Sequence, residues 1–284
     1  MTLPLSSLRG ELAALLGPQR VCADAPLAPL TTFRIGGPAD LLAEARGADE
    51  LARVVECAFA HGVPLTLLGG GSNVLVADAG VPGLVVRAHG GRIERTPEGV
   101  RADAGVTING LVRFTVQRGL GGLAAWAGTP GTVGGAISGN AHFDGRVIGE
   151  RVARVQRTGE VLLWADFRVE TADPDVLREA ARQSLAFRKR TQPLAQPSAG
   201  CIFRNPDPVQ PGLPESAGAL IDAAGLKGLR AGGARISPLH ANFFVNEGGA
   251  RARDVAELIE RAKDVVKSRF GISLREEIVR LGGF

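Results

Sequence analysis

Two glycine-rich segments contain the residues of this chain that are best suited to bind a ligand. The first is Leu68-Gly69-Gly70-Gly71-Ser72-Asn73, and the second runs from Ala127 to Ala136 as AGTPGTVGGA. Glycine has no side chain, so the backbone of such a loop can approach a ligand closely and direct N–H groups at it. Apolar residues flank both segments, which is unusual for a flexible linker. Together the two segments could hold a diphosphate without lysine or arginine, which predicts a nucleotide site.

The sequence argues against the two commonest glycine-rich nucleotide sites. A P-loop places lysine and then Ser or Thr directly after its last glycine, and neither segment does so. A Rossmann turn must follow a strand and open a helix. The nearest match, Gly119-Leu120-Gly121-Gly122-Leu123-Ala124, follows a helical pattern over residues 108–116 and indicates the end of a helix instead. Two separated glycine loops favour a non-Rossmann fold that binds a large phosphate-bearing cofactor such as FAD.

The elements around the first loop are predicted to hold it on a rigid sheet. Residues 64–68 form a short apolar run, typical of a buried strand, that leads directly into the loop. Further strands are expected at residues 74–76 and 84–86. Ahead of them, a helix is predicted to begin with Asp49 as its N-cap and to end at Gly62.

The rest of the chain alternates short strands with helices. Strands are predicted within residues 152–169, with a turn at Gly159, and within 272–281; helices are predicted from Asp173-Pro174 and over residues 220–224 and 255–266. A proline-containing stretch breaks the first of these helices, so the main domain boundary is placed near Pro193. This alternation predicts an α+β architecture.

Composition and length narrow the class of protein. A chain of 284 residues has room for two or three domains. Lysine and arginine exceed aspartate and glutamate by only four, without a basic stripe, which disfavours nucleic acid and favours acidic small molecules as partners. No apolar run is long enough to cross a bilayer, so we expect a cytoplasmic protein. Cys22, Cys57 and Cys201 lack the spacing of a metal site, and reduced thiols without a metal are expected.

A series of motifs in the same order resembles the UDP-N-acetylenolpyruvoylglucosamine reductase (MurB) family. It begins with TTFRIGGPAD at residues 31–40 and includes both glycine segments. The later motifs are QP at 192–193, PSAGCIFRNP at 197–206, LID at 220–222, GLKG at 225–228 and HANFFVN at 240–246. The resemblance spans nearly the whole chain.

The resemblance implies both a fold and an activity. The fold would be α+β, with a two-subdomain FAD-binding region of the vanillyl-alcohol-oxidase/PCMH-like type over residues 1–192, divided at about residue 80, and a smaller α/β substrate-binding domain over 193–284. Family members reduce UDP-N-acetyl-3-O-(1-carboxyvinyl)glucosamine to UDP-N-acetylmuramate for peptidoglycan, with electrons that pass from NADPH through FAD. FAD and NADPH are therefore the expected cofactors. We expect a monomer with no nucleic-acid or membrane partner.

The resemblance also implies which residues hold the cofactor. They lie in the first motif and in the two glycine segments: Arg34, Gly36, Gly69, Gly70, Gly71, Ser72, Asn73, Gly128, Thr129, Gly131, Thr132, Gly134 and Gly135.

Reduction of a vinyl ether beside a carboxylate needs a proton donor and a group that stabilises an enolate. The family's donor is usually a serine in a Gly-Ser-x-Phe motif, and Cys201 occupies that position here. A thiol is a stronger acid than an alcohol, so Cys201 could donate the proton. The alternative is that Cys201 is only a small buried apolar residue and that the acid lies elsewhere. The second catalytic group matches Glu277, or Glu276 if the register differs. Asn205 matches a substrate contact, and Arg235, Asn242 and Asn246 are weaker candidates.

One family element is missing from this chain. The arginine of a Tyr-Arg-x-Ser segment would polarise the substrate carboxylate, but the chain passes almost directly from Gly159 to the strand around Trp164. Arg168 is a candidate for that role, although it is better explained as a surface charge of the strand. The chain contains no tyrosine, which indicates the compact family type without the tyrosine loop. Two alternatives stay open: a flavin- or UDP-sugar-binding homologue with weak or no catalysis, and an oxidase of the same flavin superfamily.

Overall fold

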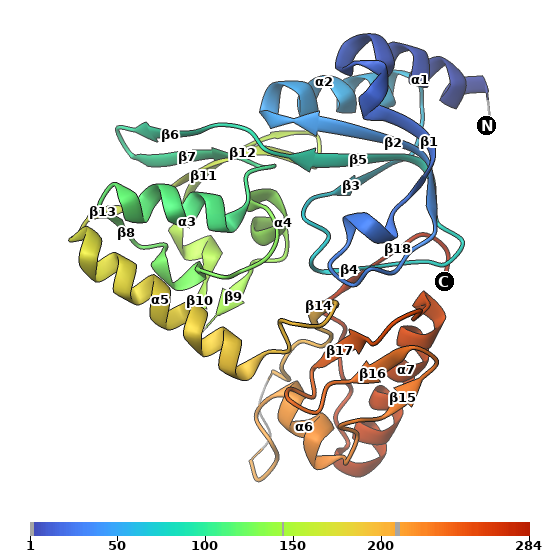
Figure 1. The fold of residues 1–284 in the computed structure, drawn as a ribbon, viewed down its shortest axis with the longest axis vertical. Helices are drawn as coiled ribbons and strands as arrows, with labels where there is room; N and C mark the ends of the chain where they lie inside the picture. Colours follow the sequence, from blue (N-terminus) through green and yellow to red (C-terminus); the bar gives the residue numbers. More distant parts are fainter. Residues whose placement is uncertain (1–2, 144, 208–210) are drawn as a thin grey trace. The chain divides into compact units, whose positions relative to one another are not determined.

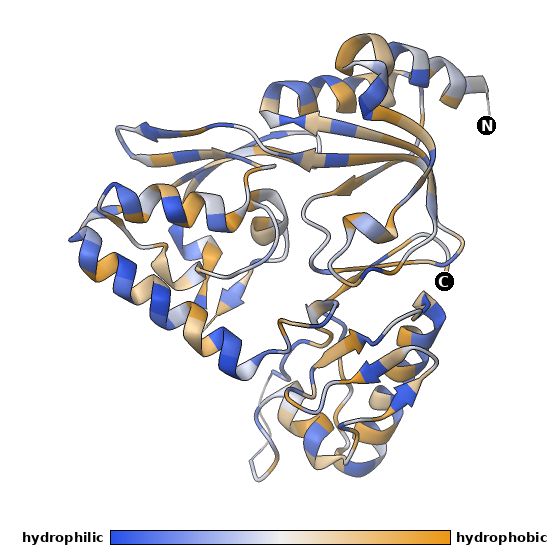
Figure 2. Cartoon of the chain, viewed as in Figure 1, coloured by the Kyte–Doolittle hydropathy of each residue, from blue (hydrophilic) through white to orange (hydrophobic). Residues whose placement is uncertain are grey.

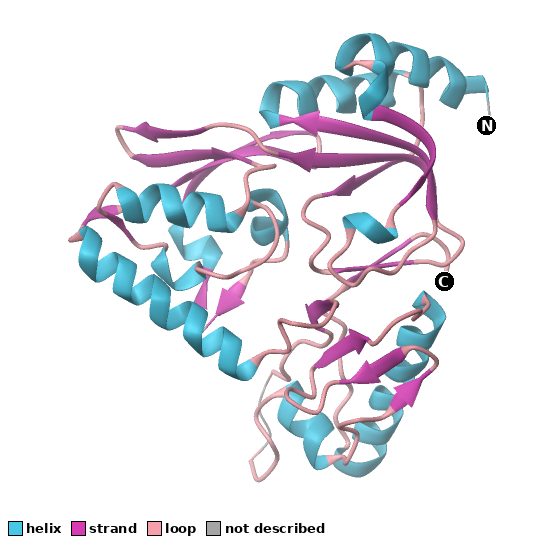
Figure 3. Cartoon of the chain, viewed as in Figure 1, coloured by secondary structure: helices cyan, strands magenta, loops and turns pink. Residues whose placement is uncertain are grey.

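The computed structural model describes residues 3–143, 145–207 and 211–284 and divides into two compact units. The first unit comprises Met1–Ala25, Ala39–Gly70 and Pro82–Arg188, and the second comprises Pro26–Pro38, Gly71–Val81 and Lys189–Phe284. Both contain helices and strands (Figure 3), which confirms the predicted α+β class. Each unit is built from separate stretches of sequence, while the domain boundaries near residues 80 and 192 stay predictions.

A four-stranded sheet begins the first unit, in the order β1-β2-β5-β3. Helices α1 and α2 cover one of its faces (Figure 1), and their apolar sides bury residues such as Leu12 and Val54 against Leu41 and Leu84 of the sheet. The elements are α1 (Leu3–Leu16), β1 (Val21–Pro26), β2 (Pro38–Arg46), α2 (Gly47–Ala60), β3 (Leu65–Leu68) and β5 (Val81–His89). Strand β3 pairs in parallel with β5 and confirms the predicted strand before the first glycine loop.

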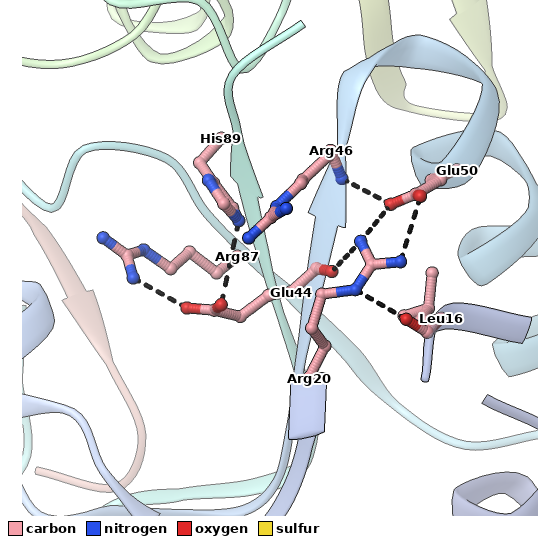
Figure 4. A network of polar contacts seen from close by, with 7 residues as sticks. All are labelled: Leu16, Arg20, Glu44, Arg46, Glu50, Arg87 and His89. Carbon is pink, nitrogen blue, oxygen red and sulfur yellow. Dashed lines mark hydrogen bonds and ion pairs between the residues drawn. The ribbon is translucent and has the colours of Figure 1, made fainter. Parts of the chain in front are cut away.

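The start of α2 differs from the prediction. Asp49 lies inside the first turn, and the N-cap residue is Arg46. The carboxylate of Glu50 accepts a hydrogen bond from the main-chain N–H of Arg46 over 2.8 Å and pairs with Arg20, 2.6 Å away (Figure 4). The prediction of Asp49 as the N-cap was therefore wrong, because the helix begins at Gly47, and the side chain that bonds the N-cap N–H is that of Glu50.

Glu44 of β2 completes this polar network. It pairs with Arg87 over 2.7 Å and lies 3.8 Å from the Nε2 atom of His89 (Figure 4). Burial lowers the pKa of His89. The network links the strands β2 and β5 to α2 and to Arg20, which directly precedes β1.

The remainder of the first unit is an antiparallel sheet, in the order β11-β12-β7-β6, with three helices. The predicted turn at Gly159 joins β11 to β12, and α3 ends before Gly119, as expected. Hydrophobic and hydrophilic residues alternate along α5 (Figure 2), as in a helix with one buried side. The elements are β6 (Ile93–Thr96), β7 (Gly99–Asp103), α3 (Ile108–Gln117), β8 (Leu120–Gly121), α4 (Val133–Ser138), β9 (His142–Phe143), β10 (Arg146–Val147), β11 (Val152–Thr158), β12 (Val161–Phe167), β13 (Glu170–Thr171) and α5 (Pro174–Thr191).

The second unit contains an antiparallel sheet in the order β14-β17-β16-β15, packed against α6 and α7. Its core includes Phe203, Phe244 and Leu258, all almost fully buried. The elements are β4 (Val74–Val76), β14 (Ser198–Cys201), α6 (Ala217–Ala223), β15 (Arg230–Ala231), β16 (Ala234–Ile236), β17 (Phe243–Asn246), α7 (Ala252–Phe270) and β18 (Val279–Leu281).

The closing strand is shorter than predicted. Only Val279–Leu281 form a regular strand, β18, which pairs in parallel with β4. Before it, Glu276 makes a single antiparallel bridge to Phe203. The segment therefore changes partner, first to the chain after β14 and then to β4, which a uniform strand could not do. Among the described helices, none is long and apolar enough to cross a membrane.

Candidate active site

Gly69 and Gly70 of the first glycine segment lie against the second segment within the first unit. A Cβ atom added to Gly70 would stand 2.6 Å from the Cα of Gly131, and one added to Gly69 would stand 2.5 Å from the Oγ1 of Thr132. Real Cβ atoms do not approach other atoms so closely. Glycine is thus required here because two backbones pack together, a reason beyond the ligand approach inferred from sequence.

Side chains of neighbouring elements fix the second segment. Thr132 is the N-cap of α4, and its hydroxyl accepts from the N–H of Gly135 over 3.4 Å. From α3, Asn109 accepts from the N–H of Gly128 over 2.7 Å and donates to the carbonyl of Thr129 over 3.2 Å. Asn109 was not among the candidate residues. The only feature of the sequence that could have indicated it is a polar amide in the first turn of a predicted helix.

A buried cation stands beside the same segment. Arg188, near the end of α5, is only 6% exposed, and its Nη2 donates to the Oγ1 of Thr129 over 2.8 Å. Its guanidinium carbon lies 3.6 Å from the ring centroid of Phe143. One turn earlier, Ser184 donates to the carbonyl of Ala125 over 2.7 Å. Arg188 was not among the residues that the sequence motifs indicated.

The first glycine segment continues into the second unit with Gly71, Ser72 and Asn73. There the carbonyl of Gly71 accepts from the N–H of Thr32 over 3.0 Å. Gly36 lies against β4, where an added Cβ would stand 2.7 Å from the Cβ of Val76. Arg34 is exposed, with a left-handed backbone of φ 57°. Thr32 thus bonds the loop directly and Gly36 packs against the strand that follows it.

Cys201 and Glu277 belong to two chain segments that run beside each other. The N–H of Glu277 donates to the carbonyl of Ile202 over 2.8 Å, and the N–H of Arg204 donates to the carbonyl of Arg275 over 2.9 Å. Cys201, at the end of β14, and Glu277 are both half-buried. The structure thus pairs the segment that directly follows Cys201 with the segment that contains Glu277, within the second unit.

The main chain just before Cys201 is loosely surrounded by other atoms. Gly200, directly before it, has φ +76°, and an added Cβ would meet only the carbonyl oxygen of Ser72 among the described residues, at 3.9 Å. Ser72, which belongs to the first glycine segment, therefore lies close to the main chain just before Cys201.

Glu276 is held by basic residues of its own unit. Lys263 lies 2.6 Å from one carboxylate oxygen of Glu276, and the Nε of Arg280 lies 2.8 Å from the other. Burial acts to raise the pKa of Glu276, but the hydrogen bonds from Arg280 and Lys263 prevail and lower it. A carboxylate committed to two cations is a poor choice for the reacting group, which favours Glu277.

The other candidate residues have local structural contacts. The side-chain oxygen of Asn205 accepts from the N–H of Ala217, 3.1 Å away at the start of α6. Asn242 is buried and bonds both main-chain groups of Phe203, at 2.9 and 2.8 Å.

Three further candidates also bind neighbouring groups. Asn246 donates to the carbonyl of Phe33 over 3.1 Å, and Arg235 pairs with Glu247 over 3.0 Å. Arg168 is exposed after β12 and donates to the carbonyl of Glu150 over 3.2 Å.

The donor set of the glycine segments suits a diphosphate. In the second segment the main-chain N–H groups of Gly128, Thr129, Gly134 and Gly135 are already bonded within the protein. The two segments still offer the hydroxyls of Ser72, Thr129 and Thr132 and the neighbouring cation of Arg188, and they contain no carboxylate. Such groups bind phosphate oxygens well. Among the residues that the structure describes, no group of three or more His, Cys, Asp or Glu side chains could hold a metal ion.

Two family models match the chain. The model of the UDP-N-acetylenolpyruvoylglucosamine reductase C-terminal domain matches residues 192–281, and that of an FAD binding domain matches residues 39–170. The second match covers both glycine segments, and the first covers both predicted catalytic residues.

Several proteins similar to this chain are named UDP-N-acetylenolpyruvoylglucosamine reductase. The UDP-N-acetylenolpyruvoylglucosamine reductase of Synechococcus sp. (strain CC9605) is 39% identical over 90% of this chain and 94% of its own. That of Moorella thermoacetica is 40% identical over 96% of this chain and 97% of its own. The crystal structure of MurB from Thermus caldophilus matches with a TM-score of 0.69 and 33% identity, over 92% of this chain and 98% of that one.

Proposed function

The chain belongs to the UDP-N-acetylenolpyruvoylglucosamine reductase family, and from this premise we propose that Cys201 and Glu277 carry out its acid–base chemistry. The protein is an FAD-dependent oxidoreductase that uses NADPH to form UDP-N-acetylmuramate in peptidoglycan precursor synthesis. Its fold joins a PCMH-like FAD-binding region to the family's C-terminal domain. Nothing in the comparisons indicates a homologue that has lost catalysis.

The observation that carries the proposal is the pairing of the two segments that contain Cys201 and Glu277. FAD, when bound, would supply the hydride for the terminal carbon of the vinyl group. Cys201 then gives its thiol proton to the carbon that bears the carboxylate, which completes addition of two hydrogens across the double bond. Glu277, held by its main chain beside Ile202, orients the substrate and the developing enolate.

Arg188 is the cation that we propose for the cofactor side of the site. It is held against Thr129 of the second glycine segment, and its charge favours a phosphate there. The exposed Arg168 donates to the carbonyl of Glu150. We therefore do not propose that it replaces the arginine of the missing Tyr-Arg-x-Ser segment.

The partners of this enzyme are the enolpyruvyl UDP-sugar and NADPH. We further propose a cytoplasmic monomer that binds neither nucleic acid nor membrane, in keeping with the modest surplus of four positive charges. Light scattering of the purified protein tests the monomer, and a dimer mass at micromolar concentration would reject it.

Anaerobic stopped-flow of the purified protein tests the catalytic assignment. NADPH should bleach the flavin absorption, and the enolpyruvyl UDP-sugar added next should restore it. Wild-type flavin that bleaches but does not recover with this substrate would show that the site cannot reduce the vinyl group, and the roles of Cys201 and Glu277 would fall together.

A further inference from the structure

Asn73 contacts the segment of Glu277 at two points. Its side-chain Nδ2 donates to the main-chain carbonyl of Glu277 over 3.1 Å. Its own main-chain carbonyl accepts from the N–H of Val279 over 2.9 Å. The resemblance had implied a cofactor role for this residue, but its side chain is directed at the segment of the predicted catalytic glutamate.

These contacts fix the backbone of Glu277 from both sides. The N–H of Glu277 donates to Ile202, and its carbonyl accepts from Asn73, so neither main-chain group can turn without losing a hydrogen bond. The parallel pairing of Val74 with Val279 begins directly after Asn73. With the backbone held, the carboxylate of Glu277 can reach only the few directions that its rotamers allow.

The amide is well suited to this task. Asparagine offers an N–H donor to a carbonyl oxygen, whereas aspartate of nearly the same size would place a negative oxygen beside it. Loss of the donor would therefore leave the carbonyl of Glu277 unsatisfied, or repelled, and would release the segment at that point.

We propose that the side chain of Asn73 is a positioning residue for Glu277 and not a cofactor contact. This inference rests on the proposed role of Glu277. The residue that positions Glu277 would then belong to the glycine segment whose main chain is expected to face the cofactor. The two functions of the segment are then separable, because one uses backbone and the other uses a side chain.

The test compares Asn73→Ala and Asn73→Asp with wild type by three measurements. These are the FAD dissociation constant, the rate of flavin reduction by NADPH, and the rate of flavin reoxidation by the enolpyruvyl UDP-sugar. FAD affinity and reduction should stay within about threefold of wild type, while reoxidation should slow by about 10- to 100-fold, since small misplacements of a catalytic group have effects of this size. A FAD dissociation constant raised tenfold or more, with reoxidation of the loaded enzyme unchanged, would overturn the inference.

Asn109→Ala is the matched control. It removes an asparagine that bonds the main chain of the second glycine segment in the same way, at Gly128 and Thr129. It should weaken FAD binding and leave reoxidation of the loaded enzyme close to wild type, the opposite of the Asn73 variants. Melting curves of the FAD-loaded variants identify any that fail to fold, and Asn73→Asp then replaces Asn73→Ala or the reverse.

A double variant separates this inference from the catalytic assignment. In a Glu277→Gln background, Asn73→Ala should slow reoxidation no further, because a residue that acts through Glu277 has nothing left to position. An additional tenfold loss in that background would reject the inference while Glu277 keeps its role. Full activity of Glu277→Gln would instead reject the proposed role of Glu277, and the inference with it.

Discussion

The main-chain N–H of Glu277 donates to the carbonyl of Ile202 over 2.8 Å. These residues are far apart in the sequence, yet this bond sets the chain that follows Cys201 beside the chain that leads into β18. The geometry of the proposed proton-transfer site is therefore set by main-chain pairing, and the proposed role of each side chain can be tested by substitution.

Cys201→Ala should abolish flavin reoxidation while leaving flavin reduction by NADPH intact. A lost general acid typically slows the step that needs it by about 10²- to 10⁴-fold. Anaerobic stopped-flow of the two half-reactions measures both rates. Cys201→Ser is the matched control, since a hydroxyl at this position is usual in the family, and it should keep much of the activity. Rapid reoxidation of the alanine variant would show that the proton comes from another group.

Glu277→Gln and Glu276→Gln should affect different properties. The first should slow reoxidation by about 10²-fold or more, because the carboxylate is lost from the site. The second breaks the contacts with Lys263 and Arg280 and should lower stability by about 1 kcal/mol with little effect on the rate. Stopped-flow and urea unfolding separate the two effects. A rate loss confined to Glu276→Gln would assign the catalytic role to Glu276.

Gly70→Ala should weaken FAD binding by at least tenfold. Its new Cβ would stand 2.6 Å from the Cα of Gly131, so the two glycine segments must move apart. Gly10→Ala is the control, because Gly10 lies in α1 with nothing within 4 Å of an added Cβ, and should stabilise the helix by about 0.5–1 kcal/mol. Flavin fluorescence titration gives both affinities. Equal affinities would mean that the packing of the loops does not shape the cofactor site.

Arg188→Ala should weaken FAD binding by about tenfold, and Arg188→Lys should recover part of the loss. Lysine keeps the charge but cannot reproduce the planar contact with Phe143 together with the bond to Thr129. Lys189→Ala, at the exposed next residue, should have no effect on the same titration. A phosphate contact also predicts that added salt weakens wild-type binding more than that of Arg188→Ala; the same salt dependence in both would contradict it.

Asp166→Asn should destabilise the protein at neutral pH and lose this effect in acid. The hydrogen bond from Arg101, 2.8 Å long, lowers the pKa of the buried Asp166 carboxyl below its usual value, with a further contribution from Arg154 at 3.1 Å. Because the folded pKa lies below the unfolded one, the stabilisation is present above the unfolded pKa and disappears as pH falls through the folded value. We expect a difference of about 2 kcal/mol at pH 7.

Urea unfolding over a range of pH measures that difference. Asp175→Asn is the control, because Asp175 is paired with Arg178 at a highly exposed position and should change stability by less than about 0.5 kcal/mol. A difference for Asp166→Asn that grows in acid would contradict the assigned direction of the pKa shift.

Local patterns were enough to locate the parts of the site but not to join them. The flanking apolar strand and the glycines themselves marked the first segment, and β3 lies where the pattern placed it. The contact of Arg188 with Thr129 could not be inferred, because the two residues are 59 positions apart and only packing of α5 brings them together. The choice between Glu276 and Glu277 likewise depended on Lys263 of α7, which lies 13 positions before Glu276 and reaches it only through the packing of that helix.

The hydrogen bonds made by Asn109 and Arg188 order the second glycine segment before the expected cofactor binds. They hold the main chain and a hydroxyl of this segment by contacts within the protein itself. A loop already ordered in this way has little conformational entropy left to lose when a ligand arrives. Cofactor capture should therefore resemble docking onto a rigid surface, with an association rate set by diffusion and charge and with little heat-capacity change from loop folding.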